Sequence, residues 1–276
     1  MSEDIVFIGC GRITRALVQG LVAAGRPPHT LRGVSRTGAG ARVLGAEFGM
    51  RVVARAEDAI SGAGVVMLAV HPHEAVSALK DIAGAVSTDQ LVVSLVASCH
   101  TDAVAEALPG PAVVRAVPNV AVAVRTGVTV LSAGPGAGSD ELALAEAVFS
   151  AVGQVATVPE GMLETVSALS GAGPALTAYF VKALSAAGVA QGLPIATAEV
   201  LAAQAIRSTA ALLAEEGTTP DDVIDAVASP GGMTEAALFA LGERGVPGAV
   251  GHALDAAVRL SFGRRITAAA HPVGGS

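Results

Sequence analysis

Short apolar runs alternate with longer amphipathic stretches over the first half of the chain. The runs, rich in Val, Ile and Leu, predict strands at 5–8, 31–34, 51–53, 65–70, 91–95, 113–116, 127–131 and 154–158. Stretches with helical spacing of apolar residues lie between the first of these runs, at 13–24, 39–48, 73–82 and 102–108. Strands that are apolar throughout are typical of a parallel sheet covered on both faces. The alternation therefore predicts a doubly wound α/β sheet.

The pattern changes after about Pro159, where the strand signal stops. Helices are predicted in the second half at 161–192, 194–216, 220–228 and 234–265, with Gly and Pro between them. We therefore expect an α/β domain over residues 1–158 and an all-helical domain over 159–266. Residues 267–276 show no periodicity, and we expect this tail to be disordered.

Two glycines stand directly between the first predicted strand and the first predicted helix. Gly9 permits a tight turn, and Gly11 lets the backbone approach a pyrophosphate that faces the first amides of the helix. The third glycine of the G-x-G-x-x-G fingerprint is replaced by Thr14, and a structural turn without a ligand is the alternative. The pattern predicts a Rossmann domain for a nicotinamide cofactor, whose pyrophosphate contacts Ile8, Gly9, Gly11, Arg12 and Ile13.

The end of the second strand indicates which cofactor is preferred. An acidic residue there would bind the ribose of NAD, but this chain has Ser35, Arg36 and Thr37. Two hydroxyls and a guanidinium suit the 2′-phosphate of NADP, although Arg36 could also be an ordinary surface side chain. We expect NADPH to be preferred, with NADH possible. The ends of the fourth and fifth strands complete the predicted cofactor site, with Ala69, Val70, His71, Pro72 and Ala97.

Composition excludes several classes of partner. The net charge is −7 and aromatic residues make up 3% of the chain, which argues against nucleic acid. The apolar runs are too short to cross a membrane, and the first strand begins at once, so we expect no signal peptide and a cytoplasmic location. Cys10 and Cys99 have no metal-binding spacing, and we expect both to be buried and reduced. His71 and His73 form an H-x-H without a well-placed third ligand, so no metal site is predicted.

Two Gly/Pro clusters interrupt the helical half, at 169–176 and 228–235. In the second, Gly231 and Gly232 precede a helix and would expose backbone amides to a carboxylate. Thr234 adds a hydroxyl beside them. A helix cap at Thr234, after an ordinary loop, is the alternative.

In these motifs the chain resembles the pyrroline-5-carboxylate reductase family, which reduces a cyclic imine to proline. The resemblance runs from Ile5 to about Arg265 and includes the first turn and the strand end at 35–37. It is also carried by Ala69-Val70-x-Pro72, Arg115-Ala116-Val117-Pro118-Asn119, Ala168-Leu169-Ser170-Gly171-x-Gly173-Pro174-Ala175 and Ser229-Pro230-Gly231-Gly232-x-Thr234. The last two, in this order, distinguish the family from other Rossmann dehydrogenases.

The resemblance implies a homodimer built by the helical domain, with further assembly possible. It also implies that NADPH reduces a cyclic imino acid, and that the protonated imine is positioned without an ionisable acid from the protein. Thr234 would be the catalytic residue, a hydrogen-bonding partner of the imine nitrogen that orients it. The implied substrate-binding residues are Ser229, Gly231, Gly232, Met233, Thr234 and Asn119.

The chain departs from the family pattern at several pocket positions. Val120, Ala121, Ala172 and Leu176 replace residues that are more polar or aromatic in the family, or Pro, which makes the pocket more apolar. The resemblance implies 1-pyrroline-5-carboxylate as the substrate, and these departures leave a related pyrroline or piperideine carboxylate open. Two alternatives stay open: an NADP-dependent dehydrogenase of the β-hydroxyacid type, with Lys182 as its acid, and a non-catalytic paralogue that binds the cofactor.

Overall fold

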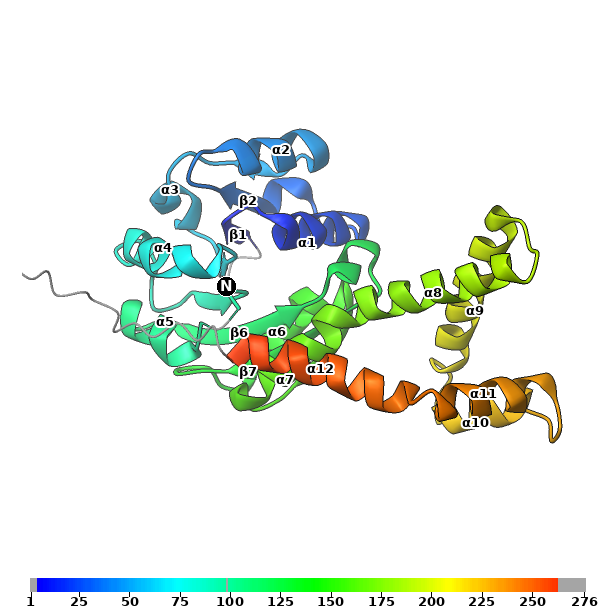
Figure 1. The fold of residues 1–276 in the computed structure, drawn as a ribbon. Coiled ribbons are helices and arrows are strands. Elements are labelled where there is room, and N and C mark those ends of the chain that lie inside the picture. The colour runs from blue at the N-terminus through cyan, green and yellow to red at the C-terminus, as the bar shows by residue number, and fades with distance from the viewer. Residues whose placement is uncertain (1–3, 98, 263–276) are drawn as a thin grey trace, which may run out of the picture. The chain divides into compact units, whose positions relative to one another are not determined.

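The chain forms two compact units (Figure 1) in a computed structural model that describes residues 4–97 and 99–262. One unit contains the described residues up to Gly171 together with Val258–Phe262, and the other contains Ala172–Ala257. The domain boundary after residue 158 stays a prediction. The expected tail at 267–276, and the last residues of the helix predicted at 234–265, lie outside the described residues.

The first unit is built on one eight-stranded sheet, and every strand predicted from the sequence is present within one or two residues of its expected ends. The sheet order is β3-β2-β1-β4-β5-β6-β7-β8. The strands are β1 (Ile5–Ile8), β2 (Leu31–Val34), β3 (Arg51–Val52), β4 (Val65–Leu68), β5 (Leu91–Ser94), β6 (Ala112–Pro118), β7 (Gly127–Ala133) and β8 (Gly153–Thr157). This order, with the central strands parallel, confirms the predicted Rossmann fold.

One strand pair departs from the parallel arrangement. β6 and β7 are antiparallel, with Ala116 opposite Leu131. The connection between them covers residues 119–126 only and holds the short 3-10 helix η3 (Val120–Val124). A parallel pair needs a crossover of a dozen or more residues, so this connection permits only an antiparallel return.

Helices cover both faces of the sheet, as the apolar strands predicted. Ile5 and Phe7 of β1 are buried in a core that includes residues of α1 (Arg12–Ala23), α2 (Ala39–Phe48) and α6 (Ser139–Ser150). Val6 and Ile8 point the other way, into a core with α3 (Ala56–Ile60), α4 (Ala75–Ile82) and α5 (Thr101–Ala107). Of these helices, α3 and α6 were not predicted. This part of the unit also contains two further short 3-10 helices, η1 (Pro28–Thr30) and η2 (Pro72–Glu74).

The first unit ends in a helical segment whose geometry changes along its length. A 3-10 turn, η4 (Glu160–Met162), leads into α7 (Leu163–Val166), and a π-helical turn, η5 (Ser167–Gly171), follows. π-helical turns are rare and occur frequently at functional sites. This turn coincides with the first half of the motif at 168–175.

The second unit contains helices that bury few of their residues. They are α8 (Ala172–Ala190), α9 (Ile195–Leu212), α10 (Pro220–Val227), α11 (Met233–Glu243) and α12 (Val246–Phe262), the last of which ends in the residues grouped with the first unit. The helix predicted at 234–265 is divided at Arg244–Gly245, where Gly245 has a φ of 68°. Among the described residues of this unit, only Ala198 and Ala202 are buried.

In the part of the chain that the structure describes, no helix is both long enough and apolar enough to span a bilayer.

Candidate functional site

The first glycine turn brings three strand ends together. The amide of Gly9 donates to the carbonyl oxygen of Val34 at 2.8 Å, and the amide of Ala69 donates to that of Ile8 at 2.8 Å. Gly9 has a φ of 101°, and a Cβ atom there would lie 2.5 Å from the carbonyl oxygen of Ala69. Only glycine fits this position, because any side chain would push the turn away from the end of β4.

Thr14 explains why the fingerprint does without its third glycine. The side chain is fully buried, and its hydroxyl donates to the carbonyl oxygen of Gly9 at 2.8 Å. The hydroxyl therefore holds the turn against the first turn of α1, which is the packing role of the missing glycine. Beyond it, a Cβ atom at Gly11, the N-cap of α1, would meet no described atom within 4 Å. This open space before a helix N-terminus fits a pyrophosphate.

The polar residues after β2 have partners within the chain. Ser35 Oγ accepts from the amide of Ala41 at 3.2 Å, at the start of α2. Arg36 is 82% exposed, and its Nη1 lies 2.9 Å from Oε1 of Glu74. The contact between Glu74 and Arg36 was not predicted, because nothing in the local sequence pattern links the two residues. Glu74 also accepts from the amide of His71 at 3.4 Å, so one carboxylate touches two predicted cofactor-binding residues.

The other predicted cofactor residues follow the carboxyl ends of β4 and β5. After β4, which ends at Leu68, come Ala69, Val70, His71 and Pro72, and the exposed Ala97 follows β5. The rings of His71 and His73 are stacked, with centroids 5.7 Å apart. Within the part of the chain that the structure describes, no three His, Cys, Asp or Glu side chains gather as metal ligands would.

Both cysteines are free thiols in the first unit. Cys99 is buried, as expected, whereas Cys10 is only partly buried. Burial raises the pKa of the Cys10 thiol to about 12, and burial also raises the pKa of Cys99. Because the thiolate is the reactive form, both shifts lower the reactivity of these thiols at neutral pH.

Asn119 connects the end of β6 to the π-helical turn. Its Oδ1 accepts from the amides of Ala121 at 3.2 Å and Val128 at 3.3 Å, and its Nδ2 donates to the carbonyl oxygen of Ser170 at 3.3 Å. The side chain thus holds η3, β7 and η5 together. Its predicted contact with a substrate is not tested by these bonds.

A buried ionic cluster fixes α7 beside β6. Arg115 is 3% exposed, and its guanidinium lies 3.1 Å from Oε1 of the buried Glu164 and 3.4 Å from Oε1 of Glu160. Glu160 also accepts from the amide and hydroxyl of Thr101, at 2.9 and 2.7 Å, and His100 Nδ1 lies 3.7 Å from it. The cluster was not predicted, because its members are far apart in the sequence. It holds the helical segment that leads into the 168–175 motif.

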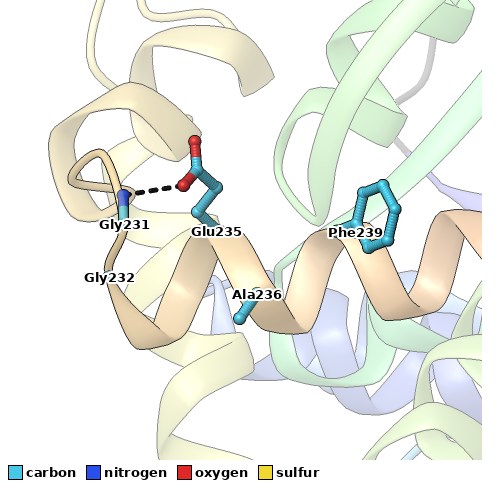
Figure 2. A pocket seen from close by; sticks show the side chains of 5 residues that line it. All are labelled: Gly231, Gly232, Glu235, Ala236 and Phe239. Carbon is cyan, nitrogen blue, oxygen red and sulfur yellow. Dashed lines mark hydrogen bonds between the residues drawn. The ribbon is translucent and has the colours of Figure 1, made fainter.

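The loop before α11 shows which residue caps that helix. Gly232 is the N-cap of α11 and Thr234 is its second residue, so the alternative interpretation of Thr234 as the cap is wrong. The amide of Gly232 donates to the carbonyl oxygen of Ser229 at 2.9 Å. The amide of Gly231, which has a φ of 70°, donates to Oε2 of Glu235 at 2.7 Å (Figure 2).

Beside this bond lies an open pocket of about 380 Å³. Figure 2 shows the residues that line it: Gly231, Gly232, Glu235, Ala236 and Phe239. Met233, a predicted substrate contact, is 90% exposed, and Thr234 is partly buried. The roles of these loop residues stay predictions.

Comparison with known proteins covers both units. Residues 160–262 match the family model described as "pyrroline-5-carboxylate reductase dimerisation". Residues 4–98 match a second family model, described as "NADP oxidoreductase coenzyme F420-dependent". The pyrroline-5-carboxylate reductase of Synechocystis sp. is 35% identical over 263 residues, covering 95% of this chain and 98% of that protein. The reductase of Mycobacterium tuberculosis is 37% identical over 287 residues, covering 95% of this chain and 97% of its own.

Solved structures give the same result. A pyrroline-5-carboxylate reductase from Coxiella burnetii is 31% identical with a TM-score of 0.89, covering 97% of this chain and 100% of that one. The Plasmodium falciparum pyrroline carboxylate reductase, solved with NADP bound, shares the fold with a TM-score of 0.83 at 22% identity, over 96% and 99% of the two chains. With matches of this extent over both the nucleotide-binding and the helical unit, the chain belongs to the pyrroline-5-carboxylate reductase family.

Proposed function

We propose that this protein is an NADPH-dependent reductase of 1-pyrroline-5-carboxylate, or of a closely related pyrroline or piperideine carboxylate, and forms proline or its counterpart. The observation that carries the proposal is the match to pyrroline-5-carboxylate reductases over nearly the whole chain. The glycine turn, the loop before α11 and the π-helical turn lie where the motifs of that family stand in the sequence.

The residues of the chain bind and orient, and none of them is proposed to exchange a proton. When bound, NADPH supplies the hydride that reduces the imine carbon. A protonated imine already carries the proton that the amine product needs. Thr234 Oγ accepts a hydrogen bond from that protonated nitrogen and can donate one to the amine that replaces it. The loop at 229–234 holds the carboxylate, so the substrate is fixed at both polar ends.

The nicotinamide cofactor fits the first unit. The open space at Gly11 and the first amides of α1 receive the pyrophosphate. Ser35, Arg36 and Thr37 receive the 2′-phosphate, which would compete with Glu74 for Arg36. The remaining contacts are those expected at the ends of β1, β4 and β5. These assignments support NADPH as the preferred cofactor.

The helical unit is proposed to join two copies of the chain. Large apolar side chains are exposed on several of its helices, among them Tyr179 (73%), Val200 (68%) and Phe239 (67%). A monomer would leave these faces in water, whereas a second copy of the same unit covers them. The match of residues 160–262 to a dimerisation family supports a homodimer.

The experiment that tests the activity is NADPH oxidation over a panel of five- and six-membered cyclic imino acids. Turnover of one panel member supports the proposal, and the best substrate names the imine. Reduction of NADP by 3-hydroxy acids instead would favour the dehydrogenase alternative, for which Lys182 is an exposed residue of α8. Tight NADPH binding without turnover of any panel member would identify a non-catalytic paralogue.

A further inference from the structure

The carboxylate of Glu235 lies on the backbone amide where the proposed function needs a substrate carboxylate. Oε2 of Glu235 accepts from the amide of Gly231 at 2.7 Å, as Figure 2 shows. The neighbouring amide of Gly232 is already bonded to the carbonyl oxygen of Ser229. The loop therefore presents Gly231 as an amide that binds an anion, and the anion is a side chain of the protein itself.

Glu235 is placed there by ordinary helix geometry. It is the third residue of α11, and a Glu at this position commonly reaches back to amides before the helix. Here it passes the N-cap, Gly232, and bonds the residue before it. Gly231 can offer its amide in this direction because its φ is 70°, a conformation that glycine adopts without strain.

The contact is one that a substrate can replace. Glu235 is exposed and lines an open pocket, so its side chain can rotate into water without leaving a buried charge unpaired. A second carboxylate cannot use the same amide while Glu235 holds it. An ionised Glu235 in place beside a bound anion would also repel it.

Resting on the proposed function, we propose that Glu235 is an intramolecular competitor of the substrate carboxylate, and so a residue that determines affinity and specificity. Each substrate that carries a carboxylate must displace Glu235 from Gly231, and this weakens its binding. A cyclic imine without a carboxylate makes no such demand. Glu235 therefore reduces the preference of the site for imino acids over imines that lack a carboxylate.

The test compares wild type with Glu235→Gln, which keeps the shape of the side chain and removes its charge. We expect KM for 1-pyrroline-5-carboxylate to fall about threefold to tenfold, the effect of replacing a charged competitor at an exposed helix N-terminus by a weaker, neutral acceptor. The kcat and the KM for 1-pyrroline, which lacks the carboxylate, should not change. Glu243→Gln, at the other end of α11, is the matched control and should leave all three values as in wild type.

A second measurement separates this inference from the proposed function. The dissociation constant of L-proline, measured by calorimetry, should fall by the same factor in Glu235→Gln and stay constant in Glu243→Gln. A wild type that binds L-proline but reduces no imine refutes the proposed function, while the comparison of proline affinities still decides the role of Glu235. Equal affinities in wild type and Glu235→Gln, or an equal gain for 1-pyrroline, overturn the inference.

Discussion

At the scale of single residues, the position of Thr234 within α11 makes its role measurable. The N-cap of the helix is Gly232, so the Thr234 hydroxyl is not needed to begin the helix. Thr234→Ala should therefore change stability little and lower kcat/KM by about 10- to 100-fold, the effect of one hydrogen bond of about 1.5–3 kcal/mol to a charged partner. The measurement is steady-state NADPH oxidation, with a thermal melt of the same sample.

Thr234→Ser is the matched control, because it keeps the hydroxyl and should keep most of the activity. NADPH affinity should be the same in both variants, since the predicted cofactor residues lie in the other unit. A folded Thr234→Ala protein with near-normal turnover of its best imine would show that the hydroxyl does not touch the substrate.

Arg36 and Glu74 form a pair that tests cofactor preference. The guanidinium is exposed and lies 2.9 Å from the carboxylate. Arg36→Ala should weaken NADPH binding by about 1.5–3 kcal/mol and leave NADH binding nearly unchanged, because only NADPH carries a 2′-phosphate. Glu74→Gln frees the guanidinium and should strengthen NADPH binding.

Titration of both cofactors by fluorescence checks this pair. Arg55→Ala is a suitable control, because Arg55 is also exposed and also pairs with a glutamate, Glu57. If wild type binds NADPH and NADH equally well, the assignment of 35–37 to the 2′-phosphate is wrong.

These residues also show where sequence reasoning stops. The glycine turn was predicted because Gly9 and Gly11 are adjacent to a strand and a helix in the chain itself. The contacts of Glu74 and Glu235 were not predicted, because the partners of these side chains depend on side-chain direction. Glu235 stands at a spacing from Gly231 that fits a helix start, but the sequence cannot show which amide it reaches.

At the scale of elements, we expect the largest loss of stability from breaking the buried ionic cluster of Arg115, Glu160 and Glu164, which joins β6 to η4 and α7. Arg115→Met would leave Glu164, which is 1% exposed, as a buried carboxylate without a cation. We expect a loss of about 3–5 kcal/mol in the free energy of unfolding, measured by urea denaturation.

The double variant Arg115→Met/Glu164→Leu tests whether the loss comes from the unpaired Glu164 carboxylate or from lost packing around Arg115. With both buried charges gone, stability should recover in part, because Glu160 is 19% exposed on its side chain and reaches water. A double variant that is less stable than Arg115→Met would contradict an uncompensated charge as the cause.

The elements were predicted well where hydrophobicity alone decides them. Each predicted strand is present, and the central strands β1, β4 and β5 are buried along their whole length, so they have no polar position to confuse the pattern. The helix α6 was missed, since its apolar residues Leu142, Leu144, Ala145, Val148 and Phe149 leave no clean polar face. The antiparallel direction of β7 was not predicted. The short connection between β6 and β7 is a sequence signal for it, but the alternation of strands and helices elsewhere favoured a parallel sheet.

At the scale of the whole molecule, we expect an obligate dimer built from residues 161–265, with an interface above roughly 2,000 Å². The helical unit exposes many apolar side chains, and among its described residues two alanines are buried. Sedimentation at micromolar concentration should give the mass of two chains. Val200→Glu, in α9, should shift the mass towards one chain, whereas the matched Val43→Glu in the first unit should not. A monomeric wild type would refute the dimer.

The order of the two kinds of structure along the chain has a consequence for synthesis. All eight strands lie between Ile5 and Thr157, ahead of α8–α12. Translation runs from the N-terminus at about 5–20 residues per second. The sheet can therefore fold while the helices with exposed apolar side chains are still inside the ribosome or not yet made. The helical surface proposed to join two chains thus emerges late, attached to a domain that can already have folded. We therefore expect the risk of aggregation through these helices to begin only near the end of synthesis, and the proposed pairing of two chains to end it.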